Sequence, residues 1–384
     1  MSEPATAKRP KISGARPYFH DEDMPQILAR LEEIIRGGRL IFGQNTRVFE
    51  ESFRRHVGTQ HAVSVSSCTA ALEITMRFFG VAGREVIVPT NTFAACVSAI
   101  KYAGGIPLLA DMDPDTFCLD TEDVLRRINS KTAGVIVVHI AGLIHPEIDR
   151  LGEICREHGL FLIEDPSHAH GAMIDERPAG SLSDAACFSF YPTKVMTTGT
   201  GGMITTNNAA LAEYARSLRH HGQGKSLEEI VNFGSDWCMD EISAALGVYQ
   251  LRRLEENVAH RNRVVEWYRR GLSVVEWIKV PLYPENLRHA YYKFPVMVDE
   301  GIDKQKLFEI MLNEYQIEMG SIYDPPCHQH PVFQREFGFH DGMFPRTEAV
   351  LGRQVCLPVH AAITEDDVTA VIAALNEIAP RIRK

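Results

Sequence analysis

Long apolar runs are missing from this chain of 384 residues, and their absence excludes whole classes of protein. A membrane-spanning helix needs about 20 consecutive apolar residues, and no stretch reaches that length. The N-terminal segment MSEPATAKRPKISG also lacks the apolar core of a secretory signal. We therefore expect a soluble, cytoplasmic protein with no membrane partner.

An excess of basic charge is also absent. The chain has 40 lysines and arginines against 50 aspartates and glutamates, and the basic residues are scattered rather than arranged in a stripe. Because nucleic-acid binding requires a concentrated basic surface, we expect no nucleic-acid partner. Small molecules and further copies of this chain remain as partners.

Closely spaced cysteine pairs are the third absence. The eight cysteines form no Cys-x-x-Cys motif, and most stand in apolar segments. A free thiol packs there as a small hydrophobic side chain. The pattern indicates reduced structural thiols.

The chain does contain a regular alternation of short apolar runs with longer amphipathic segments. The runs are AVSVSS (62–67), EVIVP (85–89), IPLLADMD (106–113), GVIVVH (134–139), LFLIED (160–165), AACFSF (185–190) and GMITT (202–206). Apolar strands separated by helices predict an α/β domain, in which a mostly parallel sheet is covered by helices on both faces.

The length and pattern predict three regions. They are a polar N-terminal tail (1–15), a large α/β domain (16–255), and a C-terminal part (256–384) made of a linker helix and a small α+β domain. The segment LGVYQLRRLEENVAHRNRVVEWYRRGL (246–272) predicts one long helix with an exposed charged face that connects the two domains.

Ligands of open α/β sheets bind beyond the carboxyl ends of the strands, so the residues after each run are the candidate site. Thr69 and Ala70 open a helix after the first run, where unpaired N–H groups favour an anion. A simple helix cap is the alternative. Asp165 ends a buried run, and a buried carboxylate needs a partner such as a protonated pyridine nitrogen, unless it serves as a structural cap.

Lys194 follows the run 185–190 and precedes the glycine-rich TTGTGG (197–202). Most lysines are ordinary surface residues. A strand-helix-strand unit of about thirty residues, however, brings two strand ends to one ligand, and Lys194 stands at that distance from Asp165. A partly desolvated amine beside a pyridinium can act as nucleophile and as acid–base. The pair indicates pyridoxal-phosphate (PLP) chemistry.

On these segments the chain resembles the DegT/DnrJ/EryC1/StrS family of sugar aminotransferases, a branch of the fold-type-I PLP enzymes. The resemblance runs from Phe42-Gly43 to Leu357-Pro358-Val359-His360. Several strings in the right order are more specific than one short motif. The most specific are SSCTAALEI (66–74), VPTNTF (88–93), IEDPSHAHGA (163–172), FSFYPTK (188–194) and GTGGMITT (199–206).

The resemblance implies a role for each candidate residue. It implies that Lys194 carries PLP covalently and moves protons, and that Asp165 pairs with the pyridine nitrogen. For Phe93 and His168, a place in the protein core is the alternative. The further cofactor contacts that the resemblance implies are Thr69, Ala70 and Ser189 for the phosphate, Phe93 for the ring face and His168 for the ring hydroxyl.

The segment GSDWCMDE (234–241) departs from the family pattern. Asp236 replaces an asparagine that in the family reaches across a dimer interface to the phosphate, and Cys238 replaces an arginine. Two unit charges 4 Å apart at an effective dielectric constant near 20 interact by about 4 kcal/mol. We therefore expect Asp236 to turn away from the phosphate, to bind it through water or to be protonated, and cofactor affinity to be weaker.

Substrate contacts are less specific. The loop PPCHQHP (325–331) resembles the family's sugar-pocket loop and makes His328 and His330 candidates, together with Tyr292 or Tyr291. The His-x-His pair also raises a metal site, but no acidic or cysteine cluster completes one, so we expect no metal.

The resemblance implies transfer of an amino group from L-glutamate to a keto-sugar, commonly nucleotide-linked, by a homodimer with shared active sites. One alternative is a PLP-dependent sugar dehydratase or deoxygenase. Such family members typically carry histidine where this chain has Lys194. Another is a non-catalytic sensor or assembly protein, which loss of the lysine would have indicated.

Overall fold

Seven strands form the central sheet of the computed structural model, which describes residues 11–226 and 228–383. Their order is β1-β9-β8-β5-β4-β2-β3, and β9 alone runs antiparallel to its neighbours β1 and β8. The strands are β1 (His61–Val65), β2 (Glu85–Pro89), β3 (Ile106–Ala110), β4 (Thr132–Val138), β5 (Phe161–Asp165), β8 (Ala185–Ser189) and β9 (Gly202–Thr206). Each overlaps one of the seven apolar runs, with β1 and β4 starting one and two residues earlier, and the predicted α/β fold with a mostly parallel sheet is confirmed.

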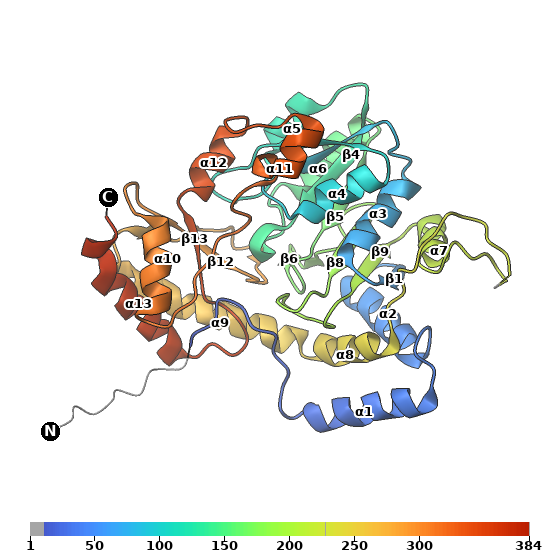
Figure 1. Cartoon of the computed structure of the whole chain (residues 1–384), viewed down its shortest axis with the longest axis horizontal. Helices are drawn as coiled ribbons and strands as arrows, with labels where there is room; N and C mark the ends of the chain where they lie inside the picture. Colours follow the sequence, from blue (N-terminus) through green and yellow to red (C-terminus); the bar gives the residue numbers. More distant parts are fainter. Residues whose placement is uncertain (1–10, 227, 384) are drawn as a thin grey trace.

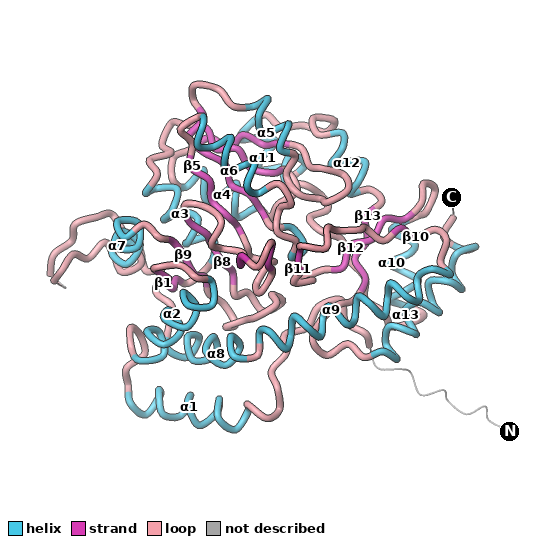
Figure 2. Tube along the Cα trace, turned by 180° about the vertical axis from the view of Figure 1, so that it is seen from behind, coloured by secondary structure: helices cyan, strands magenta, loops and turns pink. Residues whose placement is uncertain are grey.

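Helices cover both faces of this sheet, as Figures 1 and 2 show. One apolar core lies under α3 (Cys68–Phe78), α4 (Ala94–Tyr102) and α7 (Ala209–Leu218). The other face packs against α2 (Gln44–Val57), α5 (Thr121–Arg127), α6 (Ile148–Glu157) and α8 (Glu241–Arg252). Helix α1 (Met24–Gly37) lies along α8. The strands are therefore buried on both faces, which explains their continuous apolar runs.

A second, smaller core is built on the antiparallel sheet β10-β12-β13. Its strands are β10 (Ile278–Lys279), β12 (Phe294–Val298) and β13 (Gln354–Leu357). Its helices are α10 (Lys304–Asn313), α13 (Glu365–Ile378) and the last turns of α9 (Leu254–Gly271). The short helices α11 (Pro331–Phe337) and α12 (Pro345–Leu351), with the 3₁₀ turns Ile140–Gly142, Leu272–Val274, Cys327–Gln329 and Ala379–Arg381, complete the fold.

The N-terminal segment joins the small core. Ile12 is buried there, donates its N–H to the Gln316 carbonyl at 2.9 Å and accepts from the Glu318 N–H at 2.9 Å. Residues 1–10 of the predicted tail lie outside the described residues. Ile12 departs from the expectation of a polar tail because its apolar side chain completes the core of another part of the chain.

The predicted single connecting helix is two helices. Helix α8 ends at Arg252 and α9 begins at Leu254. Between them, Arg253 forms ion pairs with Asp23 at 2.8 Å, Glu22 at 3.1 Å and Glu256 at 3.0 Å. Helix α9 then spans both cores, since its first turn packs on the large core and its last turns pack on the small one.

The connection between β5 and β8 also differs from expectation. The sequence spacing predicts a strand-helix-strand unit, but a short hairpin, β6 (Met173–Ile174) with β7 (Arg177–Pro178), stands there. Strand β11 (Leu287–Arg288) pairs with β6, so β11, β6 and β7 form a separate three-stranded sheet that ties the segment before β12 to this hairpin. The following residues bond the turn after β4, where the Ala290 N–H donates to the Gly142 carbonyl at 2.9 Å and the Lys293 N–H to the Ala141 carbonyl at 3.1 Å.

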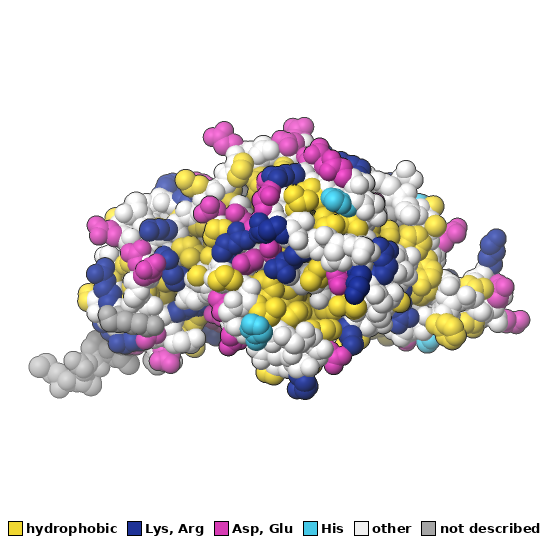
Figure 3. All heavy atoms as spheres, turned by 90° about the horizontal axis from the view of Figure 1, so that it is seen from above, with side chains coloured by type: hydrophobic (Ala, Val, Ile, Leu, Met, Phe, Trp, Pro, Cys, Tyr) yellow, Lys and Arg dark blue, Asp and Glu magenta, His cyan; other side chains and the backbone are white. Residues whose placement is uncertain are grey.

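Acidic and basic side chains are interspersed over the face in Figure 3, with no stripe of one sign. Within the described ranges, no helix combines the length and apolarity that crossing a membrane would require.

Four buried histidines predict a loss of stability in acid. Burial lowers the pKa of His145 and His360 to about 4, and that of His170 and His289 to about 3. Between pH 6.5 and about 4, each then binds a proton only when the chain unfolds, which lowers the unfolding free energy by about 1.4 kcal/mol per pH unit. This stability is complete above pH 6.5 and is lost as the pH falls.

Urea denaturation between pH 7.5 and 5 measures the effect. We expect the midpoint to move steadily to lower urea as the pH drops. A midpoint that is constant or rises over this range contradicts the prediction.

Candidate active site

A cavity of about 370 Å³ lies beyond the carboxyl ends of the large-sheet strands. Its size is within the range of small-molecule sites. Two parts of the chain line it: residues 67–201 supply most of the wall, and Tyr292 and Tyr323 come from the C-terminal part, residues 256–384. The predicted site residues that line this cavity are Thr69, Phe93, Asp165, Ser189, Lys194 and Tyr292.

Lys194 lies in the loop between β8 and β9, five residues beyond the last residue of β8 rather than at the strand end. Its backbone N–H donates to the Tyr191 carbonyl at 3.0 Å, which turns the chain back toward the cavity. The ammonium Nζ lies 4.8 Å from the centre of the Tyr292 ring. Lys194 forms no ion pair with any described residue, so its amine is held by a ring face and remains available to a ligand.

Asp165 is buried at the end of β5. One carboxylate oxygen accepts the Ser167 N–H at 3.0 Å, and the other accepts the Cys96 thiol at 3.1 Å. No lysine, arginine or histidine in the described chain forms an ion pair with it. A buried carboxylate without a counter-charge is costly, and a protonated pyridine nitrogen in the adjacent cavity would supply one.

The start of α3 lies at the wall of the same cavity. Ser67 caps this helix by accepting the Ala70 N–H at 3.1 Å. That donor is therefore already used, and Ala70 is buried behind the cavity rather than lining it. Cys68 and Thr69 line the cavity at the positive end of the helix dipole, where an anion would be favoured.

The glycine-rich loop packs tightly against this helix start. A Cβ at Gly202 would lie 2.4 Å from the Ser67 carbonyl carbon, and one at Gly201 would lie 2.5 Å from the Thr198 hydroxyl oxygen. Side chains are excluded at both positions, so the backbone comes close to the ligand site. Ser189 lines the cavity at the end of β8.

Aromatic rings form the rest of the wall. Phe93 is 60% exposed although it lines the cavity, which leaves its ring for stacking on a ligand. Tyr292 bonds the Thr193 hydroxyl at 3.1 Å. Burial raises the pKa of Tyr292, but the charges of Lys194 and Lys293 outweigh it and leave the pKa below its ordinary value.

His168 does not line the cavity. Its ring stacks on Tyr292 at 4.2 Å, and its Nδ1 accepts the Ala141 N–H at 3.2 Å. Its Nε2 lies 2.8 Å from the hydroxyl of Tyr323, which does line the cavity. Burial, aided by the charges of Lys194 and Lys293, lowers the pKa of His168 well below its ordinary value, so the ring is neutral.

Three candidates lie elsewhere. His328 is fully buried, with Nδ1 bound to the Thr90 hydroxyl at 2.7 Å and Nε2 to Glu348 at 2.9 Å, so neither ring nitrogen is left for a substrate. His330 stands at the N-cap position of α11 without a side-chain capping bond, and its ring packs edge-on against Phe333. Asp236 is exposed and does not line the cavity of its own chain. The histidines depart from expectation because their turn docks on the large domain.

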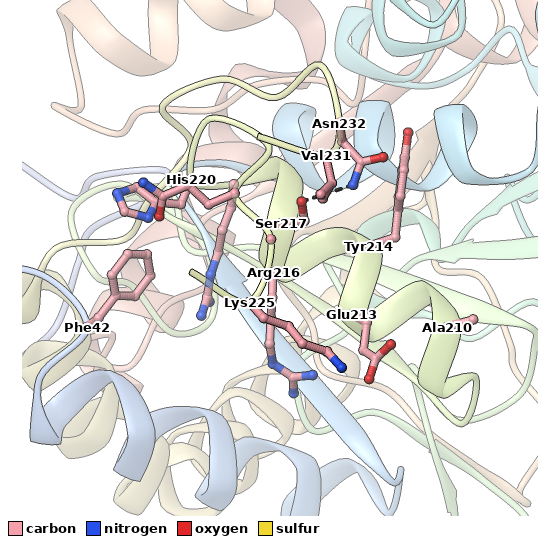
Figure 4. Close-up of a pocket in the computed structure, with 13 residues that line it drawn as sticks. Phe42, Ala210, Glu213, Tyr214, Arg216, Ser217, His220, Lys225, Val231 and Asn232 are labelled. Atoms are coloured by element: carbon pink, nitrogen blue, oxygen red, sulfur yellow. Dashed lines mark hydrogen bonds between the residues drawn. The ribbon is translucent and has the colours of Figure 1, made fainter. Parts of the chain in front are cut away.

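A second cavity of about 590 Å³ lies beside α7, between that helix and the loop that follows it (Figure 4). Figure 4 shows the side chains of Arg216, Lys225 and Glu213 along it, and all three are exposed. Lys194 and Asp165 do not line this cavity. Its own carboxylate and amine are exposed to solvent, so it lacks the buried carboxylate that distinguishes the smaller cavity.

Sequence reasoning missed Tyr323, whose side chain closes the cavity from the small-domain side. The available sequence signal was its position two residues before Pro325, where the loop assigned to the sugar pocket starts. The cavity otherwise carries the groups that PLP requires: an amine without an ion pair, a buried carboxylate without a counter-charge, an anion-ready helix start and aromatic faces.

Comparison with known proteins agrees with this arrangement. Residues 21–376 match the model of the DegT/DnrJ/EryC1/StrS aminotransferase family. GDP-perosamine synthase of Caulobacter vibrioides is 34% identical over 377 residues, covering 96% of this chain and 98% of that protein. The structure of DesI with its TDP-sugar product is 31% identical, with a TM-score of 0.89 over 98% of this chain and 95% of DesI.

Spr1654 of Streptococcus pneumoniae, solved in a PLP form, is 25% identical with a TM-score of 0.90, covering 97% of this chain and 100% of that one. The family match, the similar structures and the cavity all lead to the same assignment. The chain belongs to the DegT/DnrJ/EryC1/StrS aminotransferase family and is a sugar aminotransferase whose cofactor is pyridoxal phosphate.

Proposed function

We propose that this enzyme moves an amino group from L-glutamate to a keto-sugar linked to a nucleotide, in the cytoplasm. The observation that carries the proposal is the pair Lys194 and Asp165, which line one cavity and have no ionic partner among the described residues. GDP-perosamine synthase is named for a GDP-linked sugar, and DesI is bound to a TDP-sugar, which supports a nucleotide-linked acceptor.

When bound, PLP takes up the donor's amino group and stabilises negative charge on the carbon that loses a proton. Lys194 is placed to hold that proton on Nζ and return it, because no other basic side chain of the described residues lines the cavity. The Tyr292 ring holds Nζ within the cavity through its π-face. Phe93 and Tyr323 cover the cavity and restrict water.

A dehydratase or deoxygenase is the second candidate, and Lys194 argues against it. Proton return to the substrate carbon completes an amino transfer, and a lysine amine in the cavity provides it. No observation in the structure favours a non-catalytic sensor, since the amine and the carboxylate are both retained.

The test follows the two halves of the reaction separately. L-Glutamate added to the holoenzyme should bleach the visible cofactor band and release one equivalent of 2-oxoglutarate. A nucleotide-linked keto-sugar added next should restore the band. D-Glutamate serves as the control and should do neither. If only another amino acid bleaches the band, that amino acid is the donor in place of L-glutamate. Sugar dehydration without bleaching would favour a dehydratase or deoxygenase.

We further propose that the enzyme is a homodimer, because the loop after α7 carries unusually exposed apolar side chains. Phe233 is 97% exposed, and Ile230 and Val231 beside it are also exposed. This loop projects away from the body of the chain in Figure 1. We propose that a second copy of the chain covers these apolar side chains. Asp236, in the same loop, would then face the cavity of that second copy.

Changing Phe233 to glutamate should therefore weaken the dimer. A two-fold dimer contains the contact twice, and burial of each phenylalanine contributes about 1.5–3 kcal/mol, so the dissociation constant should rise at least about a hundredfold. Sedimentation at several concentrations measures it. Leu282→Glu is the matched control, because Leu282 is 82% exposed on the small domain. If Phe233→Glu leaves the dissociation constant of the dimer unchanged, the interface lies elsewhere on the chain.

A further inference from the structure

Tyr323 is fixed in the cavity wall from both sides. Before it, the Ile322 N–H donates to the Gln354 side chain at 2.9 Å, which anchors the segment to the small domain. After it, the Cys327 N–H donates to the Thr90 carbonyl at 2.9 Å, which anchors it to the large domain. Tyr323 itself has a φ of +48°, a left-handed conformation that is strained for a bulky residue. Such strain is retained at sites where the surroundings hold the residue in place.

The hydrogen bonds around Tyr323 have a fixed direction. The backbone N–H of Ala141 can only donate, so Nδ1 of His168 must be the acceptor and carries no proton. The neutral ring then has its proton on Nε2 and donates it to the Tyr323 oxygen at 2.8 Å. The hydroxyl proton of Tyr323 is left to donate to another group.

No described residue accepts a hydrogen bond from the Tyr323 hydroxyl. Because Tyr323 lines the cavity, a ligand bound there can accept this proton. Burial, together with Tyr292 and Asp165, raises the pKa of Tyr323 well above its ordinary value, so the phenol keeps its proton. Asp165, Lys194 and Tyr323 line the same cavity. If Asp165 pairs with the pyridine nitrogen and Lys194 binds the aldehyde carbon, the phenolic oxygen of PLP would lie on the ring edge between these two contacts.

We propose that Tyr323, and not His168, donates the hydrogen bond to the phenolic oxygen of PLP, and that His168 positions the Tyr323 hydroxyl from behind. His168 does not line the cavity, since Tyr292 and Tyr323 cover its ring. This proposal depends on PLP being the cofactor. It does not depend on which sugar or which amino donor the enzyme uses.

The test uses cofactor binding and the spectrum of the resting holoenzyme. Tyr323→Phe keeps the ring and removes the donor, and should raise the dissociation constant of PLP about tenfold to a hundredfold. The phenolic oxygen of PLP becomes more basic without the Tyr323 hydroxyl as its hydrogen-bond donor. The pH midpoint of the visible band should therefore move to higher pH. Tyr102→Phe, on an exposed tyrosine at the end of α4, is the matched control and should change neither value.

Variants of His168 distinguish orientation from direct contact. His168→Leu removes the group that orients the phenol and should give a smaller shift of the same sign. His168→Gln retains an acceptor for Ala141 and a donor for Tyr323, and should restore the midpoint. The proposal is overturned if Tyr323→Phe leaves both the midpoint and the PLP affinity unchanged, whatever its KM for the sugar. It is also overturned if His168→Leu has the larger effect.

Discussion

Replacement of Lys194 by alanine should lower the rate of amino transfer by at least about 10³-fold, within the range of a lost general acid–base with covalent catalysis removed as well. Lys194 is the one lysine, arginine or histidine that lines the cavity among residues 11–226 and 228–383. Because no second base there can take over the proton, partial rescue by a neighbouring side chain is not expected.

The measurement is the single-turnover rate with L-glutamate, followed by borohydride reduction and peptide mass analysis. The wild type should carry the cofactor mass on the peptide that contains Lys194, and the variant should not. Lys293→Ala is the matched control, because Lys293 has its Nζ 5.5 Å from the same Tyr292 ring but does not line the cavity. A variant at 194 with more than a tenth of wild-type activity would assign the proton transfer to another group.

Replacement of Asp165 by asparagine should lower turnover by about 10²- to 10³-fold, because breaking a buried ion pair costs about 3–5 kcal/mol. The amide cannot stabilise a protonated pyridine nitrogen. The stability of the cofactor-free protein should move in the opposite direction. There the carboxylate is buried without a counter-charge, so the neutral variant should unfold at the same or a higher temperature.

This opposite movement separates a role in catalysis from one in folding. Asp184→Asn is the control, since Asp184 precedes β8 and accepts the Leu162 N–H at 2.9 Å, away from the cavity. It should leave turnover within a factor of two. If Asp165→Asn lowers the melting temperature of the cofactor-free protein, the carboxylate is a structural cap.

The sequence predicted the large sheet well because its strands are buried on both faces and give continuous apolar runs. Asp165 was found for the same reason, as a carboxylate at the end of such a run. The hairpin of β6 and β7 was missed because its strands have two residues each, too short for any periodicity. The break at Arg253 was missed because its cause, an ion pair with Asp23, joins residues 230 positions apart.

The histidines show why part of the site was not predictable. A sequence shows that His168, His328 and His330 are present but not what their ring nitrogens contact. His328 is bound by Thr90, 238 residues away, and Tyr323 stands between His168 and the cavity. These contacts depend on how the small domain docks on the large one, which no local pattern encodes.

Helix α9 also matters for recombining this enzyme with its relatives. The helix belongs to both cores, so a chimera joined at the predicted boundary of 255/256 would cut it inside its first turn. A crossover at Arg253, where the backbone already leaves one helix and enters the next, keeps α9 whole. The transplanted part would bring the wall with Tyr323 and leave Lys194 and Asp165 in place, which makes this joint a natural point for exchanging substrate preference.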